Sequence, residues 1–190
     1  LTTWNARRGI VDGLSVLGTR GIVLPFSCAA WIASIHRGID VARAGWAPHV
    51  AGCTGATSER AVQALHGLPD TSMLDMGDFA GGLMKYLRRH PVPRLTIGGG
   101  IGKMTKLAQG ARDLHSARSQ VDFTALAQVL DRPELAKANT ALEAHELAGS
   151  DMAQWVAHSA LAKCRSILQT GDITVDCVVI DRTGRILARS

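Results

Sequence analysis

The sequence has no apolar run approaching the ~18 residues that a membrane-spanning helix needs, and no basic, apolar, small-residue signal segment opens it. Its four cysteines show neither CxxC nor zinc-ribbon spacing, so we expect buried, reduced thiols instead of a disulfide framework. These absences predict a cytoplasmic protein that carries no metal of its own. The first residues, LTTWNARRG, are typical of the interior of a longer chain.

Acidic residues are scarce in one segment. The stretch from Lys85 to Arg118 holds eight lysines and arginines and one acid, Asp113, whereas the whole chain has a net charge of +5. The modest charge of the whole chain suits an anionic small molecule better than nucleic acid, and the local excess should attract such an anion; we expect neither nucleic acid nor a membrane as partner.

Several catalytic motifs are missing. There is no HExxH segment and no nucleophile elbow, which weakens the hydrolase and metalloenzyme interpretations. The segment TIGGGIGK at 96–103 is not a Walker motif, because Ile97 stands where the first glycine belongs and Met104 where a Ser or Thr belongs. The dinucleotide fingerprint G-x-G-x-x-G also fails, since Lys103 or Thr105 occupies its last glycine position.

Glycine-rich joints separate short β-like runs from helical stretches, a rhythm typical of α/β folds. We expect a mostly parallel, Rossmann-like sheet with helices on both faces, followed by C-terminal helices and a β-hairpin or pair of edge strands. Strands are predicted at 48–53, 72–76 and 94–98, and a first helix from the capping Ser27 to Gly45. The predicted divisions are a connection to, or remnant of, a further N-terminal domain (1–26), an α/β domain (27–168) and a C-terminal β segment (169–190).

Three loops follow the predicted strands, at 52–58, 76–79 and 98–103. They should converge beyond the carboxyl ends of the strands, where ligands bind in such sheets. Glycines before the helix that follows TIGGGIGK could let main-chain N–H groups bind an anion, or could simply form a tight turn. Thr57 or Ser58 could cap the next helix, and Asp78 could cap a helix or meet a ligand hydroxyl or cation.

The segment RDLHSARS crowds polar side chains into a few residues after a helix. A histidine beside an aspartate, here His115 and Asp113, could move a proton near neutral pH, but His115 could equally fill a surface turn. The remaining histidines show no ligand spacing, and we expect structural roles for them: His36, His49, His66, His90, His145 and His158.

Four segments occur in an order that resembles one known family: LGTRGIVLPFS, HVAGCTGATSE, LDMGDFAGG and GGGIGKMTKLAQGARDLHSARSQVD. Over about 5–129, with a weaker match in VVIDRTGRIL, the chain is similar to the C-terminal part of the CbiD family of cobalt-precorrin-5B C(1)-methyltransferases. It departs from many members at Gly100, where they have a histidine, and at Asp12, Arg20 and Leu24.

The resemblance implies methyl transfer from S-adenosylmethionine to ring carbon 1 of a cobalt-containing, polycarboxylate tetrapyrrole in cobalamin biosynthesis. The cobalt arrives with the substrate. In this interpretation His115, oriented by Asp113, moves the proton. The donor would be bound by Thr54, Gly55, Ser58, Glu59, Asp78, Gly98, Gly99, Gly100 and Gly102. The substrate carboxylates would be bound by Lys103, Lys106, Arg112, Ser116 and Arg118.

Two rival hypotheses remain at this point. One is a fragment of an NAD-type oxidoreductase, which the α/β rhythm supports and the failed fingerprint opposes. The other is a non-catalytic corrinoid-binding module. The sequence is also compatible with a homo-oligomer.

Overall fold

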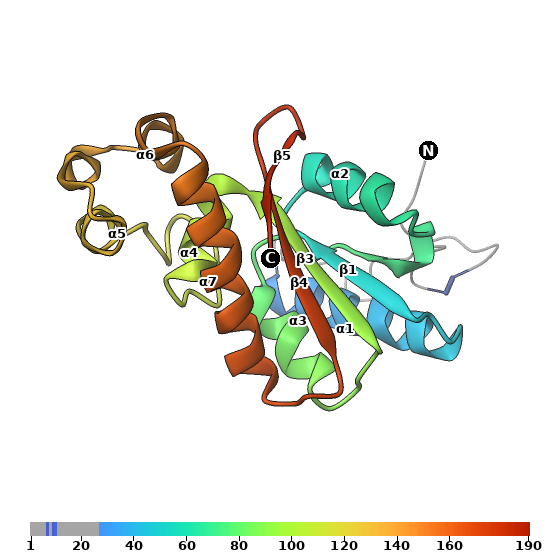
Figure 1. The fold of residues 1–190 in the computed structure, drawn as a ribbon. Helices are drawn as coiled ribbons and strands as arrows, with labels where there is room; N and C mark the ends of the chain where they lie inside the picture. Colours follow the sequence, from blue (N-terminus) through green and yellow to red (C-terminus); the bar gives the residue numbers. More distant parts are fainter. Residues whose placement is uncertain (1–6, 8, 11–26) are drawn as a thin grey trace.

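The computed structural model describes residues 7, 9, 10 and 27–190, and Figure 1 shows their arrangement. A five-stranded sheet has the order β2-β1-β3-β4-β5. Strands β1 (His49–Cys53), β2 (Met73–Leu74), β3 (Arg94–Gly100) and β4 (Thr174–Ile180) run parallel, and β5 (Ile186–Arg189) pairs antiparallel with β4. The predicted α/β class with a C-terminal hairpin is confirmed. Most of the predicted 1–26 connection lies outside the described residues.

Helices cover both faces of the sheet (Figure 1). Helices α1 (Cys28–Ala44), α3 (Ala80–Leu87), α4 (Ile101–Ala108) and α7 (Ser150–Leu168) form the main core with one face. Helix α2 (Ala56–His66) packs on the other face. Helices α5 (Phe123–Leu130) and α6 (Ala141–Ala148) lie beyond α4 and α7, at the left of the view. No helix among the described residues is long and apolar enough to cross a bilayer.

The direction of chain progression reverses between β1 and β3. Helix α2 leads from β1 to β2 at one edge, and α3 then leads back to β3 on the other side of β1. In open parallel sheets the crevice for a ligand lies at such a reversal, outside the carboxyl ends of the strands. The loops after β1 and β3 therefore flank the position where a ligand is expected.

Alternation along the strands separates the two faces. Val50, Leu95 and Ile97 are fully buried in the main core, whereas Ala51 and Cys53 face α2. Gly98 also faces α2, and a Cβ atom there would lie 2.5 Å from Val62 Cγ2. This glycine is thus needed for the close packing of α2 on β3.

The helix ends confirm some capping predictions and correct others. Ser27 Oγ accepts a hydrogen bond from Ala30 N–H (3.3 Å), and Gly45 ends α1, as predicted. The prediction that Thr57 or Ser58 caps α2 was wrong: Gly55 is the N-cap, and Ser58 Oγ donates to its carbonyl (2.8 Å). A glycine N-cap leaves no side chain to close the first turn.

Asp78 does not cap α3 either. Phe79 stands at the N-cap of α3 without a side-chain capping bond, and the Asp78 carboxylate is paired elsewhere. Strand β3 is two residues longer than predicted because Gly99 and Gly100 pair with Val179 and Ile180. Strand β2 is shorter, limited to two residues at the sheet edge.

Candidate functional site

The three glycine-containing loops lie together at the carboxyl edge of the sheet, as the sequence predicts. Thr54 N–H donates to Gly98 C=O (2.9 Å), and Gly77 N–H donates to the carbonyl of the last residue of β1 (3.1 Å). Lys103 Nζ donates to Thr54 C=O (3.0 Å) and forms an ion pair with Asp78 Oδ1 at 2.9 Å. One ammonium group therefore ties together all three loops.

The predicted donor-binding glycines divide into two groups. A Cβ atom on Gly99 would lie 2.8 Å from the Thr54 side chain, so Gly99, like Gly98, is required by packing. A Cβ atom on Gly55 or Gly100 would have no neighbour within 4 Å, and one on Gly102 would meet the Ala141 methyl at 3.8 Å. The main chain at these three glycines is the part that faces open space.

Two polar residues of the first loop are occupied by protein partners. Ser58 is buried and bonds to the loop carbonyl that precedes it. Glu59 is also buried, and its Oε1 accepts from Arg7 Nη1 at 2.6 Å. In this geometry both residues shape the loop, and their predicted contact with a donor stays a prediction.

A cavity of about 540 Å³ opens beside two of these glycines, Gly100 and Gly102. Gly100, Gly102 and Lys103 line it from the β3–α4 side, and the turn at Asp181 and Arg182 lines it from the hairpin. Thr183 O–H and main-chain N–H groups hydrogen-bond to the Asp181 carboxylate and lower its pKa to about 2. Sequence reasoning placed no site residue in this turn, although its DRTG pattern marked it.

A second cavity, of about 380 Å³, is lined by Asp78, the acidic member of the ion pair. Trp31 and Phe79 give it aromatic walls, with ring centroids 6.1 Å apart. Asp78, His115 and Arg118 add polar groups. The ion pair between Lys103 and Asp78 thus joins a residue of one cavity to a residue of the other.

The turn at 113–118 uses its carboxylate differently from the expectation. Asp113 Oδ1 accepts from the main-chain N–H of His115 (3.1 Å), and its Oδ2 pairs with Arg118 Nη1. The imidazole Nδ1 of His115 instead accepts from Ala117 N–H (3.2 Å). Asp113 therefore fixes the turn and Arg118 but does not orient the imidazole of His115 directly. Arg118 Nη2 also lies 3.4 Å from Cys28 Sγ at the start of α1.

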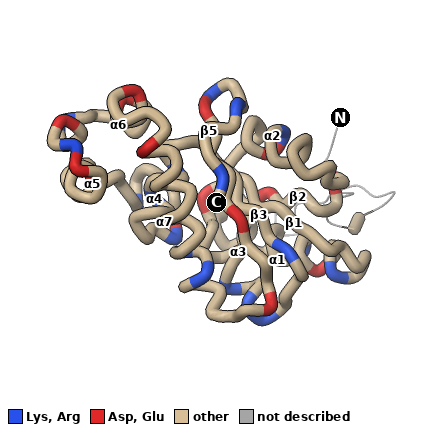
Figure 2. Tube along the Cα trace, viewed as in Figure 1, with Lys and Arg blue, Asp and Glu red and all other residues tan. Residues whose placement is uncertain are grey.

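A basic groove of about 500 Å³ adjoins this turn. The aromatic rings of His36, Tyr86 and His90 stack along it, with successive centroids 4.0 Å apart. Lysines and arginines gather around α3 and the turn after it (Figure 2). The cationic residues that line the groove are Lys85, Arg88, Arg89 and Arg112.

Two other predicted carboxylate ligands have main-chain partners. Lys106 Nζ donates to Leu114 C=O (3.0 Å); at Ser116 the main-chain carbonyl, not the hydroxyl, accepts from the Gln120 side chain. Arg112 supports α3, because its carbonyl accepts from Gly81 N–H (2.8 Å). Their roles toward a substrate stay predictions.

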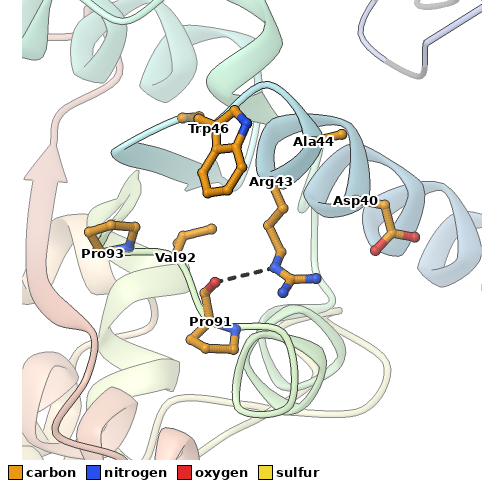
Figure 3. A pocket seen from close by; sticks show the side chains of 8 residues that line it. Asp40, Arg43, Ala44, Trp46, Pro91, Val92 and Pro93 are labelled. Carbon is orange, nitrogen blue, oxygen red and sulfur yellow. Dashed lines mark hydrogen bonds between the residues drawn. The ribbon is translucent and has the colours of Figure 1, made fainter.

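A separate hollow of about 560 Å³ lies at the opposite end of the sheet, beside the amino ends of β1 and β3 (Figure 3). Arg43 Nε donates across it to Pro91 C=O at 3.3 Å. Trp46, which is 90% exposed, borders it. None of the glycine loops contributes to this hollow.

The structure also brings together three side chains that sequence reasoning left apart. His49, His66 and Asp176 meet on the α2 face of the sheet. Burial is the chief cause that lowers the pKa of both histidines, and the nearby Arg94 lowers it further; the pKa of His49 falls to about 4. Both imidazoles are therefore neutral at pH 7. No motif spacing connects these residues along the chain; the β1–β3–β4 pairing and the packing of α2 bring them together.

Comparison with known proteins agrees with the resemblance seen in the motifs. Residues 113–190 match the family model described as CbiD, C-terminal domain. Over 98% of its length the chain is 57% identical to the cobalt-precorrin-5B C(1)-methyltransferase of Brucella anthropi, covering 54% of that protein. The protein of the same name from Paramagnetospirillum magneticum is 54% identical, again over 98% of this chain and 55% of the relative.

The chain thus spans about half the length of these curated relatives. No solved structure matches it. Almost the entire chain is nevertheless homologous to proteins named cobalt-precorrin-5B C(1)-methyltransferase, and its residues 113–190 correspond to the C-terminal domain of the CbiD family.

Proposed function

We propose that this chain provides the donor-binding and catalytic edge of an S-adenosylmethionine-dependent methyltransferase acting on ring carbon 1 of cobalt-precorrin-5B. One observation carries the proposal: open glycine main chain at the β1/β3 reversal adjoins an aromatic and cationic cavity across a single ion pair. The names of the homologues support the reaction, and the geometry of the two cavities supports the position that we propose for it.

The donor fits the cavity beside Gly100 and Gly102. Its volume of about 540 Å³ lies in the range of about 300–1,000 Å³ that is usual for sites of cofactor-sized ligands. The first turn of α4 begins at Ile101 and directs unpaired N–H groups at this cavity, which favours the carboxylate of the amino acid part of the donor. The Asp181 carboxylate is held by Thr183 and Arg185, so it fixes the turn that closes this side of the cavity.

The acceptor fits the second cavity and the basic groove beside it. The aromatic rings of Trp31 and Phe79 suit the flat edge of a macrocycle. Arg112 can form paired hydrogen bonds with its peripheral carboxylates, whereas Arg118 would share its guanidinium with Asp113. The cobalt belongs to this substrate and needs no ligand from the loops.

Methyl transfer at a sulfonium is an in-line displacement. The ring carbon supplies the electron pair of the new C–C bond, and the pair of the broken C–S bond returns to sulfur, which leaves as the neutral thioether. Alignment of the two reacting atoms and exclusion of water contribute several kcal/mol, on the order of 7–11 in well-oriented systems. The protein therefore needs to position the two ligands and needs no nucleophile of its own.

His115 is placed to accept the proton that the acceptor loses. It lines the acceptor cavity. Because its Nδ1 accepts from Ala117 N–H, the neutral ring carries its own proton on Nε2, and His115 takes up the substrate proton at Nδ1 only when this main-chain hydrogen bond opens. We expect His115→Ala to lower kcat by about 100-fold, the lower end of the usual contribution of general base catalysis, with little change in acceptor affinity. The control is His158→Ala, because His158 is exposed on α7 and bonds to its own helix. Normal turnover of His115→Ala would remove the proton role.

Calorimetric titration of the chain with S-adenosylhomocysteine, and separately with NADH, tests the proposal. We expect one site for S-adenosylhomocysteine and no binding of NADH. Gly102→Val should abolish that site while the fold remains intact, because its side chain would enter the cavity. Binding of NADH alone would support an oxidoreductase. Binding of a tetrapyrrole without any adenosyl ligand would support a corrinoid-binding module and would refute the methyltransferase proposal.

A further inference from the structure

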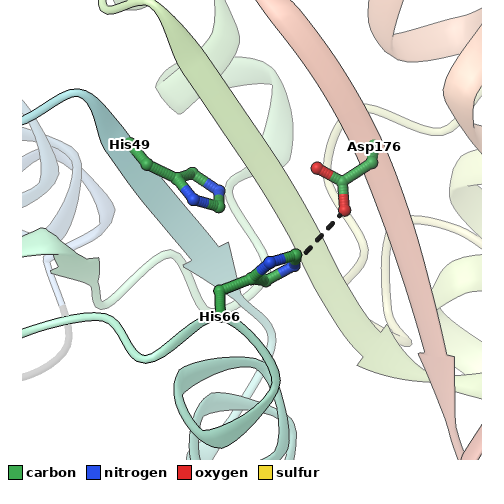
Figure 4. Close-up of side chains that lie close together, drawn as sticks. All are labelled: His49, His66 and Asp176. Atoms are coloured by element: carbon green, nitrogen blue, oxygen red, sulfur yellow. Dashed lines mark ion pairs between the residues drawn. The ribbon is translucent and has the colours of Figure 1, made fainter.

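The cluster of His49, His66 and Asp176 arises from strand register (Figure 4). Ala51, Thr96 and Asp176 are aligned across β1, β3 and β4, and His49 lies two residues before Ala51, on the same face. Helix α2 runs back over this face, and its last residue, His66, reaches the polar amino half of the strands. The fold thus assembles a polar patch where α2 ends.

The donor atoms of this cluster are close together but incompletely satisfied. Thr96 O–H donates to Asp176 Oδ1 at 2.8 Å, and His49 Nε2 lies 2.8 Å from the same hydroxyl oxygen. Arg94 also donates to Oδ1, at 3.3 Å. The other oxygen, Oδ2, is buried without a hydrogen-bond partner and lies 3.5 Å from His66 Nε2.

A carboxylate oxygen that makes no hydrogen bond and whose ion-pair neighbour, His66 Nε2, stands 3.5 Å away is unusual on a residue that is only 7% exposed. Thr96 and Arg94 fix the carboxylate through Oδ1 and leave Oδ2 directed at the imidazoles. Outer hydrogen bonds of this kind commonly orient a metal ligand.

We propose that His49, His66 and Asp176 bind one divalent transition-metal ion of the zinc type, with a further coordination position left for water. Two imidazole nitrogens and one carboxylate oxygen form a donor set that zinc accepts. The three ligand atoms lie within 4.8 Å of one another. Tetrahedral zinc places its ligand atoms about 3.4 Å apart, so the His66–Asp176 pair already has this spacing and His49 needs a modest side-chain adjustment.

Such an ion would join the end of α2 to β1 and β4. The ladders with β3 already join β1 and β4 to the sheet, whereas His66 at the end of α2 contacts Asp176 and Thr96 only at 3.5 Å. The glycine loops lie at the opposite ends of the strands. The ion would act as a clamp on the fold. This inference is independent of the methyltransferase proposal, because no residue of the donor or acceptor cavities belongs to the cluster.

Cobalt(II) and zinc(II) titrations of the untagged, EDTA-treated chain test the site. We expect one equivalent of Co²⁺ to give visible ligand-field absorption, and one equivalent of Zn²⁺ to displace it. We also expect the melting temperature to rise with added zinc. His66→Gln and Asp176→Asn should each weaken zinc binding by about 100-fold or more, since even outer partners of metal ligands contribute 10–100-fold.

His158→Gln is the matched control, because it removes an exposed histidine from α7 and should leave the zinc affinity unchanged. Circular dichroism in EDTA verifies that each variant is folded, and His49→Gln provides a third ligand variant if Asp176→Asn is not. Absence of binding to the folded wild-type chain overturns the inference. So does a zinc affinity that survives loss of His66 and His49, since the ion would then sit elsewhere.

Discussion

Lys103 and Asp78 form an ion pair of 2.9 Å between the first turn of α4 and the loop that follows β2. The same ammonium group donates to the carbonyl of Thr54 after β1. Lys103 was expected to bind substrate carboxylates, but its charge is already matched within the protein. Its structural effect is to hold the three loops at the spacing that forms the two cavities.

We therefore expect Lys103→Met to weaken S-adenosylhomocysteine binding by about tenfold, which corresponds to about 1.4 kcal/mol. The reason is that the Asp78 carboxylate loses its counter-charge and the loops lose their common partner. Calorimetry measures the effect, and Lys106→Met is the control, because Lys106 contacts the Leu114 carbonyl and does not bridge the loops. If Lys103→Met bound S-adenosylhomocysteine normally but lost affinity for the tetrapyrrole, Lys103 would bind substrate carboxylates, as the sequence predicted.

The glycines of β3 should differ in their effect on stability. An alanine at 98 would place its Cβ atom 2.5 Å from Val62 Cγ2, so Gly98→Ala should lower the free energy of unfolding by about 1–3 kcal/mol, as overpacking commonly does. Gly100 has an extended backbone (φ −66°, ψ 153°) and open space around it. Gly100→Ala should therefore leave stability unchanged or raise it by up to about 1 kcal/mol. Urea unfolding of both variants makes the comparison, and equal effects would contradict the packing role of Gly98.

The sequence predicts the order of elements and the convergence of the loops, because glycine joints and apolar runs are local signals. It does not predict which polar groups pair. Glu59 looks like a free carboxylate in GCTGATSE, yet it is paired with Arg7, which lies 52 positions earlier. Asp78 looks like a helix cap in MGDF, yet it faces Lys103. In both cases a distant cation competes with the local main chain, and only the tertiary fold decides the outcome.

The histidine and aspartate cluster illustrates the same limit. His49 begins β1, His66 ends α2 and Asp176 lies in β4, so no motif spacing connects them. The sequence of β4, TVDCVVI, did contain a signal of a polar cluster: after the exposed Thr174, Asp176 is the one polar residue among apolar ones. A buried charge in such a strand requires partners, and a search for them could have begun there.

Thr96 should stabilise the fold through this network. Its hydroxyl is fully buried and donates to Asp176 Oδ1. Thr96→Val keeps the shape but removes the donor to a buried carboxylate, so we expect a loss of about 1–3 kcal/mol in the free energy of unfolding. Thr105→Val is the matched control, because the equally buried Thr105 hydroxyl donates to the helical carbonyl of Ile101. That loss should be below about 1 kcal/mol. Comparable losses in the two variants would show that the hydrogen bond to Asp176 stabilises the fold no more than the hydrogen bond within the helix does.

The neutral histidines predict that acid weakens the fold. The pKa of His49 is lowered from 6.5 to about 4 by burial and then by Arg94, and the pKa of His66 is lowered in the same direction. Below pH 6.5 the unfolded chain takes up a proton that the folded chain refuses, so the unfolded state is favoured as the pH falls. The contribution is therefore fully present above pH 6.5 and is lost progressively between pH 6.5 and about 4.

Urea unfolding in EDTA at a series of pH values between 7.5 and 4.5 measures this dependence. We expect the slope of stability against pH to be smaller in His49→Gln than in the wild type, because glutamine takes up no proton in either state. His158→Gln is the control for the same substitution outside the cluster, at a ring that is exposed on α7. If His49→Gln retained the full wild-type slope, the acid sensitivity would have to come from other groups, and His49 would have to be as easily protonated in the folded chain as in the unfolded one.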